Sequence, residues 1–339
     1  MNRDETKYAK FALVQEMLDT INVVKNFDVN QTKDVAQEIQ KVGRLLLSGE
    51  GSSRLFPAKN VIRRALQIGT DVTIVTDGSR QSAQYNLEKF AVFCASNSGR
   101  TKEVVLLAKK MAALGNPFCY ALTANSDTLL EKECSKTFVL QCGWENAVAA
   151  TKSVVEQALF YQSILWHLTG KDGDTKLLEL SSAIRDALTQ SIDPDIIQAA
   201  KSASTIYFAG YNDGVAEELT LKTNEITRRK SDFLEGTYAV HGIEEVMEKD
   251  DIVFVIDPID EEIEKFQQVL VDGVGLKIVA IADRETPFQT IRVSSVDDLT
   301  PFVYLCAGWN LLVEIGLGLG IDLDKPERAR KVGNEFIAA

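Results

Sequence analysis

Apolar runs and helical patterns alternate along the first half of the chain. Residues 5–47 show helical spacing of apolar positions, with a strand predicted at their end over 43–48. Further patterns predict helices over 56–68 and 148–168, and strands over 71–75, 90–94, 118–122 and 137–140. Strands that alternate with helices indicate βαβ units, which build a parallel sheet with helices on both faces.

The same order of elements recurs in the second half. Helices are predicted over 215–230 and 300–319, and strands over 205–209, 251–256, 277–281 and 291–293. One recurrence at this distance indicates two copies of one fold and not a solenoid. The sequence therefore predicts an α/β protein with two doubly wound parallel sheets in three-layer αβα arrangements. The boundary is expected near 171–195, where Pro194 interrupts the helical pattern.

The strand–turn–helix unit over 89–110 contains the main candidate for binding chemistry. Its turn reads Ser96-Asn97-Ser98-Gly99-Arg100-Thr101, between an apolar run and a helical pattern. Unpaired N–H groups at a helix start attract anions, a glycine allows close approach of the backbone, and three hydroxyls add hydrogen bonds. Capping of the helix by Ser98 or Thr101 explains the same residues. The turn alone leaves both interpretations open.

In an open parallel sheet, ligands bind beyond the carboxyl ends of the strands, where 49–53, 96–101 and 210–214 all fall. The stretch 49–53 matches only half of a dinucleotide-binding Gly-x-Gly-x-x-Gly motif, so a Rossmann cofactor site is weakly supported. The corresponding turn of the second half, 257–262, reads Asp-Pro-Ile-Asp-Glu-Glu and would repel a phosphate. Only the first turn suits that anion.

Composition narrows the classes of partner and compartment. A chain of 339 residues favours two domains, and a net charge of −12 argues against nucleic acid or an anionic membrane as a partner. The five cysteines are an odd number without CxxC spacing, which predicts buried, reduced thiols in a cytoplasmic protein. The N-terminus has no signal-peptide core, and no long uncharged apolar run is expected to span a membrane.

The layout of the chain resembles the sugar isomerase (SIS) domain, a phosphosugar-binding fold. The segment 217–227, Glu-Glu-Leu-Thr-Leu-Lys-Thr-Asn-Glu-Ile-Thr, and the His-Gly pair at 241–242 resemble the isomerase domain of glucosamine-6-phosphate synthase. So do Asp-Leu-Asp-Lys-Pro at 322–326, Lys331, and Val-Ala-Ala-Thr-Lys at 148–152. The resemblance covers the chain from about residue 11. The family's glutaminase half has no counterpart in this sequence.

The resemblance implies a role for each matched residue. Glu225 would move a proton between C1 and C2 of an open-chain sugar phosphate, with Lys222 beside it. His241 would assist ring opening in the site of a neighbouring subunit, and Lys331 would meet the carbonyl end of the substrate. The phosphate would be held by Ser53, Ser96, Asn97, Ser98 and Thr101, with further contacts from Gly51, Ser52, Val148 and Ala150.

The chemistry is consistent with these roles, although simpler explanations exist. Isomerisation needs one carboxylate over two adjacent carbons, which a nearby Lys would keep ionised, and His exchanges protons near neutrality. However, Glu218, Lys222, Glu225 and Arg229 are spaced as in a solvated charged stripe of a helix. His241 in its glycine-flanked loop, and the lysines of the tail, also fit ordinary surface positions.

Four departures from the family pattern accompany the resemblance. Arg100 replaces a Glu and adds a cation beside the phosphate turn, which favours a more anionic ligand. Ala150 replaces a serine that contacts the sugar, and Ile243 replaces a proline after the His-Gly pair. Residues 336–339 extend past the usual end and are expected to affect how the C-terminal arm closes. Neither histidine lies in a plausible ligand cluster, so no metal and no other cofactor is expected.

The sequence thus predicts five consecutive segments: N-terminal helices over 1–40, a first SIS domain over 41–170, a linker helix over 171–194, a second SIS domain over 195–321 and a C-terminal arm over 322–339. The predicted activity is isomerisation or deamination of a hexose or aminohexose 6-phosphate through a 1,2-enediolate or enolamine. The enzyme would be a cytoplasmic homodimer or larger homo-oligomer with shared active sites. The alternatives are a deglycase of sugar-amine 6-phosphates and a non-catalytic sugar-phosphate sensor.

Overall fold

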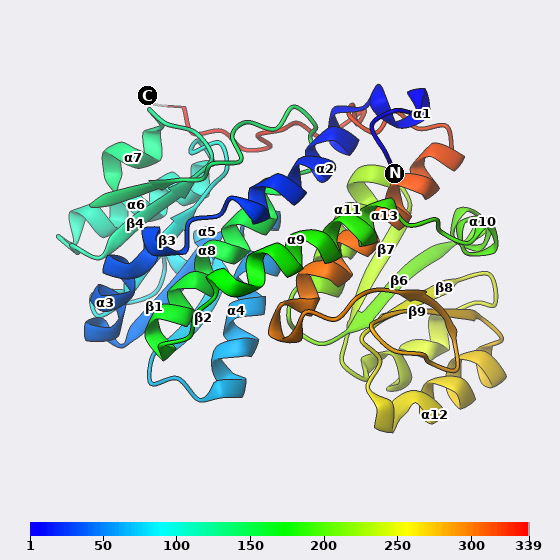
Figure 1. Cartoon of the computed structure of the whole chain (residues 1–339). Helices are drawn as coiled ribbons and strands as arrows, with labels where there is room; N and C mark the ends of the chain where they lie inside the picture. Colours follow the sequence, from blue (N-terminus) through cyan, green and yellow to red (C-terminus); the bar gives the residue numbers. More distant parts are fainter. Residues whose placement is uncertain (338–339) are drawn as a thin grey trace. The chain divides into compact units, whose positions relative to one another are not determined.

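The structure, a computed structural model, describes residues 1–337 (Figure 1). It contains two compact units. The first-sheet unit comprises Asn22–Glu145, Ala150–Leu178 and Ala329–Ala339, and the second-sheet unit comprises Met1–Ile21, Asn146–Ala149 and Glu179–Arg328. Both units are discontinuous in sequence, whereas the five predicted segments follow one another. The last two residues of the predicted arm, Ala338 and Ala339, lie outside the described residues.

The first sheet has five parallel strands in the order β2-β1-β3-β4-β5. Its strands are β1 Arg44–Gly49, β2 Thr73–Gly78, β3 Ala91–Ala95, β4 Cys119–Thr123 and β5 Lys136–Val139. In the central strand β3 all five residues are buried, because a parallel strand is covered on both faces. The predicted strands of the first half are confirmed, with bounds shifted by one to three residues.

The second sheet repeats this plan with five parallel strands in the order β7-β6-β8-β9-β10. Its strands are β6 Thr205–Gly210, β7 Lys230–Glu235, β8 Ile252–Ile256, β9 Lys277–Ala282 and β10 Gln289–Arg292. The corresponding positions in the two sheets are taken in the same chain order, which confirms the predicted α/β fold with two parallel sheets.

Helices of the first-sheet unit cover both faces of its sheet. They are α3 Lys33–Val42, α4 Leu55–Ile68, α5 Ser79–Ser82, α6 Lys102–Ala113, α7 Leu129–Glu133 and α8 Lys152–Thr169, with the short helices η1 Val29–Thr32 and η2 Gly51–Ser53. Cys94 of β3 packs with Leu107 of α6 in one core cluster. Its neighbour Phe93 points the other way and meets Phe160 and Tyr161 of α8, with ring centroids 5.6 and 5.5 Å away.

The second-sheet unit contains α1 Thr6–Ala9, α10 Pro194–Ser202, α11 Val215–Thr227, α12 Ile263–Phe266 and α13 Thr300–Gly318. Its short helices are η3 Tyr238–Val240, η4 Ile243–Val246, η5 Asp260–Glu262, η6 Gln267–Val274 and η7 Asp297–Leu299. Two further helices, α2 Ala12–Lys25 and α9 Asp174–Thr189, each contribute residues to both units.

One segment of the described chain, Asp297–Gly318, is long and apolar enough to cross a membrane by length and composition. It carries Asp297, Asp298 and Glu314, so it is not the long uncharged apolar run that the sequence analysis expected to be absent. The segment contains α13, and 78% of its apolar window is buried inside the protein, as in the core helix of a globular domain.

Three predicted helices differ from the structure. The helix predicted over 148–168 begins at Lys152. The other two differ for local reasons. The pattern over 5–47 is not one helical stretch, because η1 separates α2 from α3 and α3 ends at Gly43 in a left-handed conformation (φ 73°). The helix predicted over 215–230 ends at Thr227, where Arg228 turns left-handed (φ 53°). The chain then enters β7, an edge strand with mostly polar residues that gave no apolar signal.

Candidate functional site

The turn Ser96–Thr101 connects β3 to the N-terminus of α6 and gathers its hydroxyls. The Oγ of Ser96 lies 2.9 Å from Oγ1 of Thr101 and 3.5 Å from Oγ of Ser98. Ser98 also accepts a hydrogen bond from the Arg100 N–H at 3.2 Å. The structure therefore brings three of the predicted phosphate ligands into one cluster at the start of a helix.

The capping interpretation of this turn does not hold in the structure. Thr101 occupies the N-cap position of α6, but its side chain makes no capping hydrogen bond and turns to Ser96 instead. The Lys102 N–H donates to the Asn334 carbonyl at 2.9 Å. Within residues 1–337, the N–H groups of Glu103 and Val104 have no hydrogen-bond acceptor. A helix start with unpaired N–H groups is the feature that favours an anion.

Gly99 serves packing more than ligand approach. Its φ of 64° is left-handed, and a Cβ at this position would lie 2.4 Å from Cβ of Thr128. The Leu130 N–H also donates to the Gly99 carbonyl at 3.3 Å. The sequence analysis had assigned this glycine to close approach of a ligand, whereas the space beside it is filled by the first residues of α7.

The predicted residues Gly51, Ser52 and Ser53 form η2, directly after β1. Strand β1 pairs with β3, so both turns leave the same edge of the sheet from adjacent strands. A Cβ on Gly49 would lie 2.8 Å from the Ser53 carbonyl and 3.0 Å from the Ala95 carbonyl, which shows how closely the two chain segments pass. Gln157 of α8 fixes η2 by donating to the Ser53 carbonyl at 2.6 Å.

A carboxylate that the sequence analysis missed, Glu145, lies behind the phosphate turn with no exposed surface. It accepts hydrogen bonds from Nδ2 of Asn97 at 2.7 Å, from Oγ of Ser153 at 2.7 Å and from the Thr151 N–H at 2.7 Å. Asn97 is therefore oriented by Glu145, and the start of α8 is tied to the same group. Its only sequence signal was its position just before the Val-Ala-Ala-Thr-Lys stretch.

Glu145 also meets Lys331, whose Nζ lies 3.4 Å from Oε2. Burial alone would raise the pKa of Glu145, but the Lys331 ammonium and the hydrogen bonds from Ser153 and Thr151 lower it below its usual value. The carboxylate is thus ionised and neutralised by a residue of the C-terminal arm. Lys331, predicted to meet a substrate carbonyl, has its ammonium beside the residue that orients the phosphate turn.

The end of the C-terminal arm lies across the N-terminus of α6. Thr101 and Glu335 form an antiparallel bridge, and the Phe336 N–H donates to the Arg100 carbonyl at 2.9 Å. Nδ2 of Asn334 donates to Glu103 at 2.5 Å, and the Lys109 ammonium lies 4.5 Å from the centre of the Phe336 ring. Phe336, part of the extension beyond the usual family end, therefore anchors the arm on this helix.

Arg100 is directed toward this arm. Its guanidinium lies 3.5 Å from the Glu335 carboxylate, and both side chains are exposed. The sequence analysis expected Arg100 to add a cation for the ligand. In the structure its charge has a carboxylate partner, which weakens that expectation.

Val148 and Ala150 are half-buried in the connection between Glu145 and α8. Neighbouring backbone groups are held by Glu16, which accepts the Asn146 N–H at 2.5 Å and the Ala147 N–H at 3.3 Å. The described contacts give Val148 and Ala150 no polar side-chain role, so their predicted contacts to substrate rest on the resemblance alone.

In the second-sheet unit, Lys222 forms the centre of a buried charge cluster on α11. Its Nζ lies 2.8 Å from Oε2 of Glu225 and 3.2 Å from Oε1 of Glu218, and the side chains of Lys222 and Glu218 have no exposed surface. Burial would lower the pKa of Lys222, but the carboxylates of Glu225 and Glu218 outweigh it and raise the pKa. Lys222 is therefore a fixed cation, and a solvated stripe on this helix is excluded.

His241 lies on the same unit at the C-terminal end of η3 and is exposed. Its backbone N–H donates to the Tyr238 carbonyl at 3.1 Å. Among the described residues, no hydrogen bond or ion pair joins its imidazole to Glu225 or Lys222. The structure brings Lys222 and Glu225 together as predicted, and leaves His241 outside their cluster.

The Asp-Leu-Asp-Lys-Pro motif of the tail has a structural role in this unit. Asp324 accepts the N–H groups of Ala12 and Leu13, both at 2.8 Å, and so caps α2. The guanidinium of Arg228 donates to the carbonyls of Asp322 and Lys325, at 2.7 and 3.0 Å. The motif holds the end of α11, which carries Glu225, against the first residues of the C-terminal arm.

The turn after β8 is the counterpart of the phosphate turn, and Arg284 fills it. Its guanidinium lies 2.6 Å from Asp257 and 2.9 Å from Asp260, and it also donates to the Pro258 carbonyl. Asp257 takes a left-handed conformation with φ 46°. The acidic turn is therefore closed by its own cation, in agreement with the prediction that only the first turn suits a phosphate.

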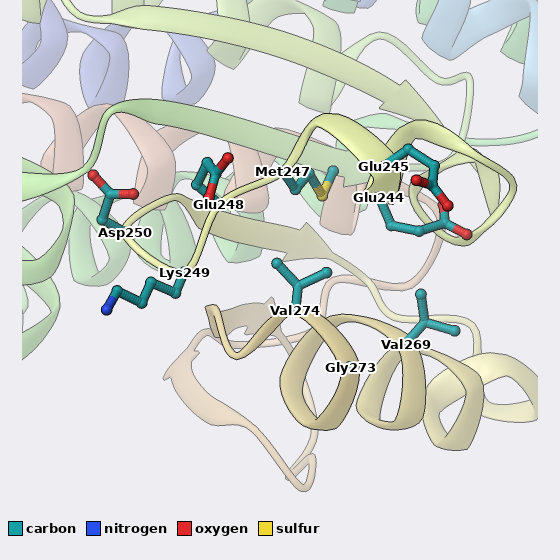
Figure 2. A pocket seen from close by; sticks show the side chains of 9 residues that line it. All are labelled: Glu244, Glu245, Met247, Glu248, Lys249, Asp250, Val269, Gly273 and Val274. Carbon is teal, nitrogen blue, oxygen red and sulfur yellow. The ribbon is translucent and has the colours of Figure 1, made fainter.

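A separate cavity of about 610 Å³ lies in the second-sheet unit, between the segment 244–250 and η6. Figure 2 shows four acidic residues on that segment, Glu244, Glu245, Glu248 and Asp250, over a helix that contributes Val269 and Val274. Acidic walls do not suit a phosphate, and none of the predicted site residues lines this cavity.

Comparison with known proteins gives a family match for part of the chain. Residues 38–166 match the family model of the SIS domain, and this segment includes the phosphate turn, Glu145 and the start of α8. The matched segment spans the first sheet. That the second sheet is a further SIS domain is not shown by this match.

A curated relative extends the similarity further along the chain. The glutamine–fructose-6-phosphate aminotransferase (isomerizing) of Clostridium perfringens is 24% identical over 293 residues, which cover 80% of this chain and 47% of the relative. The chain thus spans about half the length of that curated protein.

Two solved structures show the same fold over nearly the whole chain. The C-terminal domain of glucosamine-fructose-6-phosphate aminotransferase from Francisella tularensis has a TM-score of 0.78 at 18% identity, covering 95% of this chain and 100% of that domain. Glucosamine-6-phosphate deaminase from Thermotoga maritima has a TM-score of 0.75 at 20% identity, with coverages of 95% and 99%.

Proposed function

We propose that the protein is a phosphosugar isomerase or deaminase that acts on a hexose or aminohexose 6-phosphate through a 1,2-enediolate or enolamine. The SIS domain over 38–166 supports a sugar phosphate as ligand. The names of the similar proteins, an isomerizing aminotransferase and a deaminase of glucosamine 6-phosphate, support this reaction class. In this proposal Glu225 is the base.

The observation that carries the proposal is the Lys222–Glu225 pair. A catalytic carboxylate must be held in place and accessible. The fully buried Lys222 ammonium, 2.8 Å away, holds Glu225 in place, and 26% of the Glu225 side chain is exposed, which makes it accessible. A buried ammonium also favours negative charge that develops on an enediolate oxygen, because Coulomb interactions strengthen away from water.

The phosphate is assigned to the turn after β3. Ser96, Asn97, Ser98, Thr101 and Ser53 would donate to its oxygens, together with the Glu103 and Val104 N–H groups. Glu145 cannot touch an anion directly, and its part in the proposal is to orient Asn97. Ligand hydroxyls would meet Gly51, Ser52, Val148 and Ala150, as the resemblance implies.

Several finer parts of the proposal rest on the resemblance. They are ring opening by His241 in a neighbouring subunit's site, contact of Lys331 with the substrate carbonyl, a homodimer or larger assembly, a second SIS domain over 195–321 and a cytoplasmic location. The proposal needs no metal or other cofactor, because the carboxylate and the fixed cation supply the acid–base chemistry.

A sugar-phosphate sensor is the second candidate. The observation that favours it is that the phosphate turn, with its hydroxyls and unpaired helix N–H groups, is built within the first-sheet unit without Lys222 or Glu225. A sensor would need the phosphate turn and would not need the base.

Solvent exchange separates the two candidates. The protein is incubated in deuterated water with glucose, fructose and glucosamine 6-phosphates. Label at C2 of the two aldoses and at C1 of the ketose is measured by NMR, with ammonia assayed in parallel. We expect exchange in at least one substrate. Glu225→Gln should lower the exchange rate by about 10³-fold or more while the Kd changes by less than threefold, since the base acts only on the reaction. The control Glu264→Gln, an exposed change on α12, should behave as wild type.

The same experiment tests whether the turn after β3 binds the phosphate. Ser96→Ala combined with Thr101→Val should raise the Kd by about tenfold or more, because two hydrogen bonds to a charged group are lost. Binding without exchange for every sugar would favour the sensor. Full exchange by Glu225→Gln would remove Glu225 from the mechanism, and release of ammonia would identify a deaminase.

A further inference from the structure

Three cysteines that the proposed reaction does not use meet under α6 and α7. Cys94 lies on β3, Cys119 begins β4 and Cys134 follows the last residue of α7. Their Sγ atoms lie within 4.8 Å of one another, and those of Cys119 and Cys134 are 3.6 Å apart. The sequence predicted separate buried thiols, because no short spacing links these positions.

The three thiols differ in access to solvent. Cys94 and Cys119 are buried, whereas Cys134 is half-buried. Cys94 and Cys119 belong to the apolar cluster that includes Leu107, and Cys134 packs against it. An oxidant from solvent would therefore meet Cys134 first and would find Cys119 as the adjacent thiol.

We propose that Cys119 and Cys134 form an intramolecular disulfide when hydrogen peroxide reaches Cys134, and that this bond changes the phosphate turn through α7. In the first step the Cys134 sulfur takes a hydroxyl oxygen from the peroxide, the O–O bond breaks and water leaves with the thiol proton. In the second step the Cys119 sulfur attacks the sulfenic sulfur, the S–S bond forms, the S–O bond breaks and a second water leaves with the Cys119 proton. The two thiols lose two electrons, and the peroxide gains them.

The environment favours this chemistry over metal binding. Three thiolates around a divalent ion would place a net negative charge in an apolar core, which is costly without further partners. A disulfide buries no charge. Hydrogen bonds with the Cys134 and Cys94 thiols lower the pKa of Cys119, which supports its part as the attacking sulfur in the second step. The hydrogen bond with Cys119 raises the pKa of Cys134, so the part of Cys134 in the first step rests on its access to solvent.

Helix α7 connects the thiols to the turn. Its capping residue Thr128 fills the space beside Gly99, and the Leu130 N–H donates to the Gly99 carbonyl. Thr128 and Glu131 form a capping box, which couples the residue beside Gly99 to the body of this helix. Cys134 directly follows the last residue of α7. Its Sγ lies 3.6 Å from Sγ of Cys119 and must approach it to about 2.05 Å to form the disulfide. A short helix transmits such a shift to the residue at its other end.

The experiment oxidises the full chain with hydrogen peroxide and locates disulfides by alkylation and peptide mass spectrometry. We expect a Cys119–Cys134 linkage that dithiothreitol reverses and that Cys134→Ser abolishes, while Cys142→Ala, a change at another buried thiol, leaves it intact. The effect on the turn rests on the proposed function. The oxidised protein should bind a hexose 6-phosphate at least threefold more weakly, and reduction should restore the affinity.

Each possible result tests a different statement: the disulfide, its connection to the phosphate turn, or the proposed function. Five free thiols, irreversible oxidation of Cys134 or a linkage through Cys94 would overturn the disulfide. A Cys119–Cys134 bond with unchanged affinity would overturn the connection to the turn. Reduced protein that binds no sugar phosphate would contradict the proposed function and leave the disulfide standing, because the linkage is detected without any ligand.

Discussion

The two sheets place equivalent turns at the same point, and the turns are pinned by charges of opposite sign. After β3, the buried carboxylate of Glu145 holds Asn97 from behind, and the hydroxyls and the N–H groups of Glu103 and Val104 stay available. After β8, the guanidinium of Arg284 binds Asp257 and Asp260 and occupies the turn. One backbone plan can therefore produce an anion site or a closed turn, depending on where the pinning charge lies.

The largest expected effect tests why the first turn needs a glycine. Gly99→Ala should lower the free energy of unfolding by about 3–5 kcal/mol, because a left-handed φ adds to overlap with Thr128. The matched control is Gly115→Ala at the other end of α6, which has nearly the same φ of 65° and no atom within 4 Å. Gly115→Ala should lower the free energy of unfolding by only about 1 kcal/mol. Urea unfolding measures both, and equal losses would show that Thr128 yields to the new methyl group.

The second prediction concerns the anion that pins this turn. Glu145→Gln should lower the free energy of unfolding at pH 7 by about 2–3 kcal/mol, because an amide NH₂ replaces one acceptor among buried donors. The pKa of Glu145 is below its usual value in the folded state, so its contribution is present above about pH 4.3 and is lost as pH falls through the folded pKa.

The difference between wild type and this variant should therefore shrink on acidification. Urea unfolding at several pH values between 7 and 3 checks it, with Glu88→Gln, an exposed change in the same unit, as control. A difference that stays constant across this range would mean that Glu145 gains nothing from ionisation.

How much of this organisation could be predicted depended on burial. Continuous apolar runs such as Ala91–Ala95 located the central strands, since a strand covered on both faces needs apolar residues throughout. The edge strand β7 consists mostly of polar residues, so it gave no apolar signal and was not predicted. The turn Ser96–Thr101 was located as an anion site, yet the choice between capping and binding needed the actual direction of the Thr101 side chain.

The pinning charges could not be predicted for a different reason. Glu145 and Lys331 are far apart in sequence and meet only in the folded unit, and a lone Glu before a small-residue stretch resembles many surface positions. The same holds for the three thiols and for Asn334, whose carbonyl receives the Lys102 N–H. Periodicity indicates which side chains are buried, but not which buried polar groups find one another.

The third prediction tests whether charge alone distinguishes the two turns, by removing acidic residues from the turn after β8. Asp257→Ser combined with Asp260→Ser removes the two nearest carboxylates that hold Arg284, and leaves it Asp283 at 3.6 Å and the Pro258 carbonyl. The guanidinium then has donors to offer to an anion. We expect new binding of inorganic phosphate with a Kd on the order of 1 mM, measured by titration calorimetry in the Ser96→Ala/Thr101→Val background. Adding Arg284→Gln should abolish it. Binding that survives without Arg284, or no binding at all, would show that sign of charge does not separate the two turns.

The smallest expected effect concerns the cation within the open turn. Arg100 pairs with Glu335 at 3.5 Å, and 62% of its side chain is exposed. Exposed pairs contribute about 0–1 kcal/mol, so Arg100→Gln should change the free energy of unfolding by less than about 0.5 kcal/mol. If Glu335 neutralises Arg100, the Kd for a sugar phosphate should change by less than threefold, and Glu335→Gln should tighten binding slightly by releasing the guanidinium. A tenfold loss of affinity in Arg100→Gln would instead place Arg100 among the phosphate ligands. The open turn would then need a cation of its own, as the closed turn does.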